Sequence, residues 1–193
     1  WMQAMAIDQA LLVGHDLGGG VAQITAVRHP DRVQGLVLMN SICYDSWPIP
    51  RVKLMRFFGS VIERFPPWLL WPAFAQLIYQ GHDNRSRARE SLGAHWRSYK
   101  EYGGGRALIR QIRALDTKDT LAVADRLPGL GLPARLIWGG ADEFQKIEYG
   151  ERLSGDLGAP LDLIVGGKHF VPEDHPERVA EAIEGLLRES KAA

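Results

Sequence analysis

The feature that most constrains the fold is the segment LLVGHDLGGGVAQ, residues 11–23. A short apolar run ends in GHDLG, and apolar residues then recur at helical spacing until Pro30. A strand that turns sharply into a helix around Gly-x-x-x-Gly is a nucleophile elbow, in which the central side chain stands at the carboxyl end of the strand. The segment therefore predicts a strand–turn–helix unit with Asp16 at the tip of the turn, where parallel sheets bind ligands.

Four short apolar runs have the character of strands that are covered on both faces. They span residues 9–14, 33–40, 134–140 and 161–167, and each ends in Gly or a small polar residue. Helical patterns follow the first, third and fourth runs. This alternation predicts parallel strands flanked by helices, which is an α/β layer structure.

A long insertion separates the second and third strands. It spans residues 44–132, contains 12 of the 17 aromatic residues and has mostly helical patterns. We expect it to form a helical lid over the end of the sheet, with most of its rings in the lid's own core. The expected organisation is thus a core of residues 1–43 and 133–193 and a lid of residues 44–132.

Charge and cysteine content limit the partners and the cellular compartment that the sequence indicates. The 23 Lys and Arg balance the 23 Asp and Glu, so the chain as a whole indicates neither a nucleic-acid nor a membrane partner. No apolar stretch is long enough to span a bilayer, and no secretory signal is visible. The single cysteine, Cys43, excludes an internal disulfide and favours the cytoplasm. With no metal-ligand cluster or phosphate-binding motif, we expect no cofactor and a small apolar substrate.

Two further segments supply partners for Asp16. LIWGGADEF places Asp142 just after the third strand, and IVGGKHF places His169 just after the fourth. Because the carboxyl ends of parallel strands meet at one edge of a sheet, we expect the three side chains to converge. The order nucleophile, acid, histidine is the one that this architecture uses, with the acid orienting the histidine and the histidine activating water.

Each of these residues also has a structural interpretation. Asp16 could be a turn former, Asp142 a helix N-cap and His169 a buried histidine. The agreement of spacing and context favours the catalytic interpretation for all three. A rival position for the acid follows the second strand, but Asn40 stands there. His15 is expected to be structural, buried beside the turn.

The segments GHDLGG, HPDRVQGLVLMNS, LIWGGADEF and GGKHFVPEDHPERVAEAI resemble the α/β-hydrolase fold family. The resemblance is to the branch with an aspartate nucleophile, the epoxide hydrolases and haloalkane dehalogenases, and it covers nearly the whole chain. It implies that the four strands are the fifth to eighth of eight and that the first four have no counterpart here. We therefore expect the C-terminal part of a larger protein, with a missing N-terminal half or a second copy pairing with the first strand.

An aspartate nucleophile constrains the chemistry. Attack on an ester or amide carbonyl would give a mixed anhydride, whereas attack on the saturated carbon of an epoxide or alkyl halide gives an alkyl ester. His169 would then deprotonate a water that attacks the carbonyl carbon of Asp16. The backbone N–H of Leu17 would be one donor to the oxyanion, and the second would come from the missing portion.

The leaving group separates the two chemistries. An epoxide opens to an alkoxide that needs a proton donor, and the resemblance implies lid tyrosines, for which Tyr79, Tyr99 and Tyr102 are candidates. Many dehalogenases carry Trp directly after the nucleophile, where this chain has Leu17, although the halide donor could also be Trp47, Trp68, Trp71 or Trp96. We therefore expect an epoxide hydrolase-like activity. The alternatives are a haloalkane dehalogenase, an ester hydrolase and an inactive fragment that serves in binding or assembly.

Overall fold

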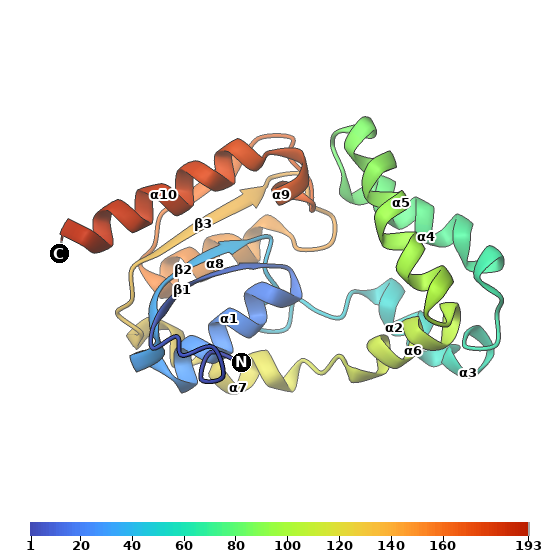
Figure 1. Ribbon diagram of the computed structural model, residues 1–193, viewed down its shortest axis with the longest axis horizontal. Helices are drawn as coiled ribbons and strands as arrows, with labels where there is room; N and C mark the ends of the chain where they lie inside the picture. Colours follow the sequence, from blue (N-terminus) through green and yellow to red (C-terminus); the bar gives the residue numbers. More distant parts are fainter. Residues whose placement is uncertain (193) are drawn as a thin grey trace. The chain divides into compact units, whose positions relative to one another are not determined.

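A computed structural model of the protein describes residues 1–192, which form two compact units (Figure 1). The sheet unit comprises residues 1–47 and 118–192, and the helical unit comprises residues 48–117. Within the described residues, none of the helices is both long and apolar enough to cross a membrane.

The sheet unit contains four parallel strands in the order of the sequence. They are β1 (Ala10–His15), β2 (Val33–Met39), β3 (Ala134–Gly139) and β4 (Leu161–Ile164). All four strands are confirmed as the sequence predicts them, with small changes at their ends. The largest change is at β4, which ends before Gly166, because that residue adopts a φ of 78° and turns the chain.

Helices cover both faces of the sheet (Figure 1). The helical elements of this unit are α1 (Leu17–Arg28), η1 (Pro30–Arg32), α7 (Lys118–Ala124), η2 (Leu127–Gly129), α8 (Ile147–Leu157), α9 (Val171–Asp174) and α10 (Pro176–Ala192). Side chains alternate across a strand, so Leu36 and Leu38 pack with α1, α7 and α8, while Val37 and Met39 pack with α9 and α10. The α/β layer structure is therefore confirmed, and α7 belongs to it although it lies within the expected insertion.

The helical unit contains α2 (Pro50–Phe57), α3 (Gly59–Ile62), α4 (Pro67–Gly81), α5 (Arg85–Glu101) and α6 (Gly104–Ala114). It includes a cluster of half-buried rings in which Phe74 lies 5.4 Å from Trp96 and 5.0 Å from Tyr99, measured between ring centroids. Other rings are more exposed than this cluster, since Phe57 and Trp68 are 81% and 72% exposed. The helical character agrees with the sequence, whereas the exposure of these rings differs from the expected packing.

Candidate active site

Asp16 lies in the sharp turn between β1 and α1, with a φ of 49° and a ψ of −119°. Residues other than glycine rarely adopt such angles, so the turn is strained. Its backbone is held on both sides: the N–H of Asp16 donates to the carbonyl of Met39 at 3.2 Å, and its carbonyl accepts from the N–H of Ile42 at 3.2 Å. The loop after β2 thus fixes the turn that presents the Asp16 carboxylate.

Glycines allow β1 and α1 to cross closely. A Cβ on Gly14 would lie 2.6 Å from both the carbonyl oxygen of Gly18 and the Cα of Gly19. A Cβ on Gly19 would lie 2.0 Å from the Oγ of Ser41, whereas one on Gly18 would meet nothing within 4 Å. The crossing of β1 and α1 therefore requires a glycine at position 14, and the contact of α1 with the loop after β2 requires one at position 19.

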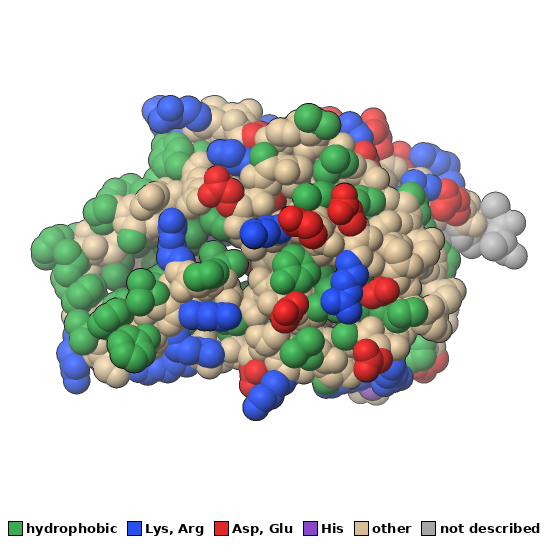
Figure 2. Space-filling model, turned by 180° about the vertical axis from the view of Figure 1, so that it is seen from behind, with side chains coloured by type: hydrophobic (Ala, Val, Ile, Leu, Met, Phe, Trp, Pro, Cys, Tyr) green, Lys and Arg blue, Asp and Glu red, His purple; other side chains and the backbone are tan. Residues whose placement is uncertain are grey.

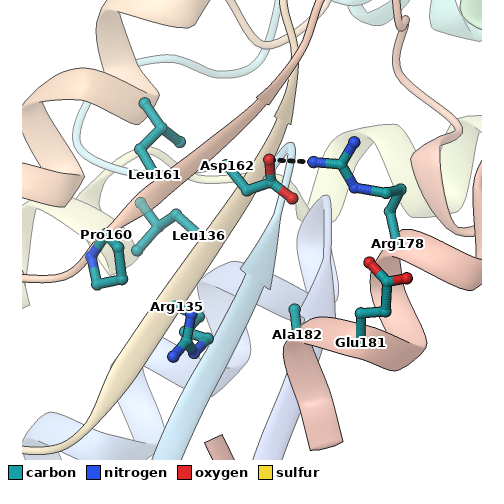
Figure 3. A pocket seen from close by; sticks show the side chains of 8 residues that line it. All are labelled: Arg135, Leu136, Pro160, Leu161, Asp162, Arg178, Glu181 and Ala182. Atoms are coloured by element: carbon teal, nitrogen blue, oxygen red, sulfur yellow. Dashed lines mark hydrogen bonds and ion pairs between the residues drawn. The ribbon is translucent and has the colours of Figure 1, made fainter. Parts of the chain in front are cut away.

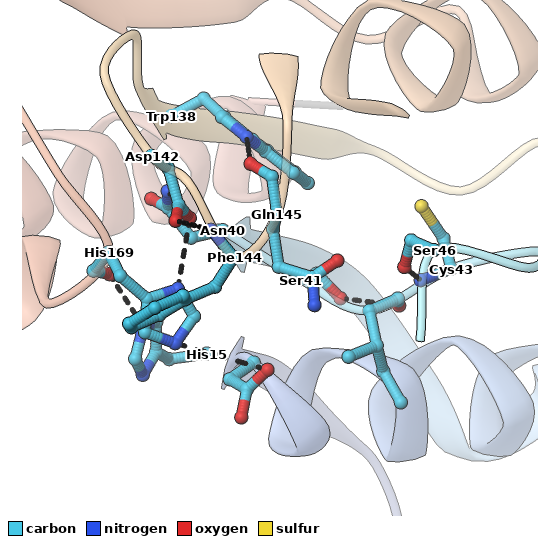
Figure 4. A network of polar contacts seen from close by, with 12 residues as sticks. His15, Asn40, Ser41, Cys43, Ser46, Trp138, Asp142, Phe144, Gln145 and His169 are labelled. Atoms are coloured by element: carbon cyan, nitrogen blue, oxygen red, sulfur yellow. Dashed lines mark hydrogen bonds and ion pairs between the residues drawn. The ribbon is translucent and has the colours of Figure 1, made fainter. Parts of the chain in front are cut away.

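His169 lies between two carboxylates. Its Nδ1 is 2.9 Å from Oδ2 of Asp142 (Figure 4), and its Nε2 is 3.9 Å from Oδ1 of Asp16. The side chains of Asp142 and His169 are 0% and 6% exposed, whereas that of Asp16 is 36% exposed. The structure therefore brings the three predicted site residues together, and Asp16 is the one that solvent or a ligand can reach.

The carboxylate of Asp142 is held by two further hydrogen bonds (Figure 4). Its Oδ2 accepts from Nδ2 of Asn40 at 2.6 Å, and its Oδ1 accepts from the N–H of Phe144 at 2.7 Å. Asn40 is fully buried, and its Oδ1 accepts from the N–H of Gly139 at 3.2 Å. The amide thus connects the ends of β2 and β3 and orients the acid that faces the histidine.

From the sequence, Asn40 was expected only to mark a position without a rival acid, so this role was not predicted. The signal that could have found it is a polar residue directly after a fully apolar strand. Such a side chain is buried with the strand end, and a buried amide requires hydrogen-bond partners. Because the neighbouring strand end carries Asp142, that carboxylate was the nearest candidate for the partner.

The two histidines of the site have opposite pKa shifts. Burial lowers the pKa of His169, but the hydrogen bond and charge of Asp142, with the charge of Asp16, raise it above the usual value. His15 packs against it, with ring centroids 4.8 Å apart, and its Nε2 donates to the carbonyl oxygen of His169 at 2.8 Å. Burial lowers the pKa of His15, and the charge of His169 lowers it further. His15 therefore stays a neutral donor beside an imidazole that readily accepts a proton.

Comparison with known proteins identifies the family. Residues 2–182 match the model described as the alpha/beta hydrolase family. The chain belongs to this family. A solved α/β hydrolase fold protein from Burkholderia ambifaria superposes with a TM-score of 0.85 at 19% identity, over 94% of this chain and 67% of that one. At this identity the likeness concerns the fold alone.

Three curated relatives of this hydrolase-family chain are longer than it is. The chain is 28% identical to the uncharacterized hydrolase YugF of Bacillus subtilis, over 97% of this chain and 68% of that protein. It is 31% identical to haloalkane dehalogenase 2 of Mycobacterium tuberculosis, over 93% of this chain and 64% of the relative. It is 23% identical to epoxide hydrolase 4 of Mus musculus, over 97% of this chain and 56% of the relative. The chain thus spans between about half and two thirds of their lengths.

The remaining predicted residues of this α/β hydrolase lie on α1 and in the helical unit. Leu17 begins α1, where N–H groups have no acceptor within the helix. The ring of Tyr79 faces the guanidinium of Arg85 at 6.0 Å, Tyr102 is 75% exposed, and the hydroxyl of Tyr99 donates to a glutamine side chain at 2.9 Å. Burial raises the pKa of Tyr99. The role of these tyrosines as proton donors stays a prediction.

A separate cavity of about 680 Å³ lies at the opposite edge of the sheet, at the amino ends of β3 and β4 (Figure 3). Three of its charged side chains take part in ion pairs: Arg178 donates to Asp162 at 2.5 Å, and Arg135 pairs with Glu189. Among residues 1–192, no group of three or more His, Cys, Asp or Glu side chains is arranged to hold a metal ion. The carboxylate–imidazole–carboxylate arrangement is therefore the strongest candidate active site in the described chain.

Proposed function

We propose that this α/β hydrolase chain carries the nucleophile, base and acid of an enzyme that hydrolyses epoxides through a covalent ester on Asp16. The observation that supports this is the buried Asp142–His169 pair, whose free Nε2 lies 3.9 Å from the partly exposed carboxylate of Asp16. An ionised carboxylate has no proton to lose, so its own attack needs no base. The histidine is then available for the second step, the activation of water.

In the first step, an oxygen of Asp16 attacks a saturated carbon of the epoxide ring. The C–O bond of the ring breaks as the ester bond forms, and the released alkoxide takes a proton from a donor. A tyrosine of the helical unit is the proposed donor, with Tyr79, Tyr99 and Tyr102 as candidates. The product of this step is a hydroxyalkyl ester of Asp16.

In the second step, Nε2 of His169 takes a proton from water, and the hydroxide adds to the carbonyl carbon of the ester. The N–H of Leu17 donates to the resulting oxyanion at the start of α1. Collapse of this intermediate expels the diol, whose oxygen takes the proton from His169, and leaves Asp16 as a carboxylic acid. Transfer of that carboxyl proton to the tyrosinate left by the first step restores both the Asp16 carboxylate and the tyrosine. Asp142 stabilises the imidazolium that exists between these proton transfers.

A haloalkane dehalogenase is the second candidate, because a relative with that name is 31% identical. The same three residues would serve it, but the leaving halide requires N–H donors in place of a proton. Leu17 offers no side-chain donor beside the nucleophile, and this favours the epoxide.

Trapping of the ester tests the proposal. In the His169→Gln variant the first step proceeds and the second is blocked, so brief incubation with styrene oxide should add one substrate mass to the chain. Peptide mapping should place the adduct on Asp16, and an Asp16→Ala, His169→Gln double variant should give none. An alkyl adduct from a 1-chloroalkane but not from epoxides would favour the dehalogenase. No adduct from either would overturn the proposal and favour a binding or assembly role.

A further inference from the structure

The first helices of the helical unit carry an apolar stripe that faces outward. Leu54, Phe57, Phe58 and Val61 follow the i, i+3, i+4, i+7 spacing of a helix face along the sequence, across the junction where α2 ends at Phe57 and α3 begins at Gly59. Such a face normally packs against a core, yet these side chains are 58%, 81%, 49% and 53% exposed. The next helix, α4, adds Trp68, which is 72% exposed. We call these five residues the apolar face; exposed patches of this kind mark binding surfaces.

The unit that carries the apolar face is strongly basic. Residues 48–117 contain 12 Lys and Arg but only five Asp and Glu, a net charge of +7. The rest of the chain contains 11 Lys and Arg and 18 Asp and Glu, a net charge of −7. The balanced total of the whole chain therefore conceals a division of charge between the two units.

The arginines beside the apolar face form hydrogen bonds that do not neutralise their positive charge. Three arginines of α2 and the segment after α3 donate to neutral oxygens: Arg51 to the side chain of Gln80 at 3.0 Å, Arg56 to the carbonyl of Ile112 at 3.2 Å and Arg64 to the carbonyl of Ser60 at 2.8 Å. Such acceptors orient a guanidinium without neutralising it. Lys53, on α2, is also exposed. Figure 2 shows Lys and Arg side chains around hydrophobic ones over this unit.

We infer that the apolar face docks on the surface of a bilayer that contains anionic phospholipids. Aromatic and aliphatic side chains would enter the boundary between headgroups and acyl chains, and the surrounding cations would pair with phosphates. A nucleic acid or an acidic protein surface would also attract the cations, but it would leave the aliphatic stripe without an apolar environment. The inference goes beyond the proposed function and does not depend on it.

Sedimentation of the full chain with lipid vesicles tests the inference. We expect at least roughly tenfold stronger binding to vesicles with about one third phosphatidylglycerol than to pure phosphatidylcholine. Raising the salt to about 0.5 M should remove most of that difference, since screening weakens the phosphate contacts. Phe57→Ser and Trp68→Ser should each weaken binding roughly fivefold, and an Arg51→Gln, Arg64→Gln double variant should weaken it on anionic vesicles alone.

Matched controls come from the sheet unit. Val165 is 90% exposed and the side chain of Arg188 is 71% exposed, so Val165→Ser and Arg188→Gln should bind vesicles like the unmodified chain. Asp16→Ala should also bind normally, which separates this inference from the proposed chemistry. Equal binding to both vesicle types, no binding by the folded chain, or equal losses in the control variants would overturn the inference. So would a dimer that forms without lipid and dissociates on Phe57→Ser, because the apolar face would then join two copies.

Discussion

The two units differ in the burial of their polar and apolar side chains and in which residues carry backbone strain. In the sheet unit, Asp142, His169 and Asn40 are buried and bonded to one another, and the non-glycine residues Asp16 and Asn40 adopt positive φ angles of 49° and 38°. In the helical unit, the positive φ angles among the described residues fall on glycines, and large apolar side chains are exposed instead.

This difference indicates that the sheet unit, more than the helical unit, holds polar side chains in fixed positions. A buried polar network is stable only when all its members are bonded, and a strained backbone persists only when its surroundings enforce it. The sheet unit meets both conditions around the Asp16 turn. We therefore expect substitutions around the Asp16 turn and its hydrogen-bond network to disturb geometry and activity, and matched changes to helix caps and glycines of the helical unit to change local stability alone.

The largest expected effect concerns the crossing of β1 and α1. Gly14→Ala should lower the free energy of unfolding by about 3 kcal/mol, because its Cβ would lie 2.6 Å from backbone atoms that cannot move aside. Gly18→Ala in α1 and Gly93→Ala in α5 place a Cβ in open space, and each should stabilise its helix by up to about 1 kcal/mol. Urea unfolding followed by circular dichroism measures all three. Equal stability of Gly14→Ala and Gly18→Ala would show that the crossing is not tight.

Substitution of one asparagine in each unit allows a more direct comparison. Asn40→Ala removes the donor to Asp142, and Asn84→Ala removes the N-cap of α5, whose Oδ1 accepts from two backbone N–H groups. Each change should lower the free energy of unfolding by roughly 1–2 kcal/mol. Only Asn40→Ala should also reduce kcat/KM for the epoxide, by about 10–100-fold, because the acid loses its orientation.

A glycine at the same position provides the control for backbone strain. Asn40→Gly relieves the positive φ of this residue but still removes the amide, so it should recover part of the stability and none of the activity. If Asn40→Gly restored kcat/KM, the backbone and not the hydrogen bond to Asp142 would be the feature that matters.

The sequence predicted those parts of the sheet unit that follow from short-range patterns. Apolar runs and glycines located four strands, and strand ends located Asp16, Asp142 and His169. It did not predict the hydrogen bond from Asn40 to Asp142, because a contact between two loops depends on strand order and register. It also did not single out Gly19, whose Cβ would meet Ser41, since a motif gives spacing but not which Cβ meets a neighbour.

The helical unit was less predictable for a different reason. Aromatic spacing indicates a helix face, but it does not tell whether that face points inward or outward. The stripe from Leu54 to Val61 has the pattern of a core and is exposed. The exposure of that face depends on tertiary structure. The opposite charges of the two units, in contrast, are hidden only by the total for the whole chain, because a count over residues 48–117 alone gives a net charge of +7.

The pH dependence of hydrolysis tests the electrostatics of the sheet unit. His169 must be neutral to accept a proton from water, and Asp142 raises its pKa above the usual 6.5. Activity should therefore fall as the pH drops through an apparent pKa above that value. Asp142→Asn removes the charge and should shift this limb about one unit toward lower pH, with a reduced maximum rate. Tyr99→Phe, in the helical unit, should leave the acidic limb in place; a shift there would contradict the assignment of the base.

The smallest effect concerns strain at the nucleophile. Asp16→Gly removes the positive-φ penalty at residue 16 and should raise the free energy of unfolding by about 1 kcal/mol while abolishing hydrolysis. Asp16→Ala also abolishes hydrolysis but keeps the strain, so it should not gain this stability. In the helical unit the opposite substitution provides the comparison. Gly103 has a φ of 99°, so Gly103→Ala should lower the free energy of unfolding by about 1 kcal/mol. Equal unfolding free energies for the two Asp16 variants would mean that the turn stores no strain, because any cost of holding residue 16 at that φ must be present in one variant and absent from the other.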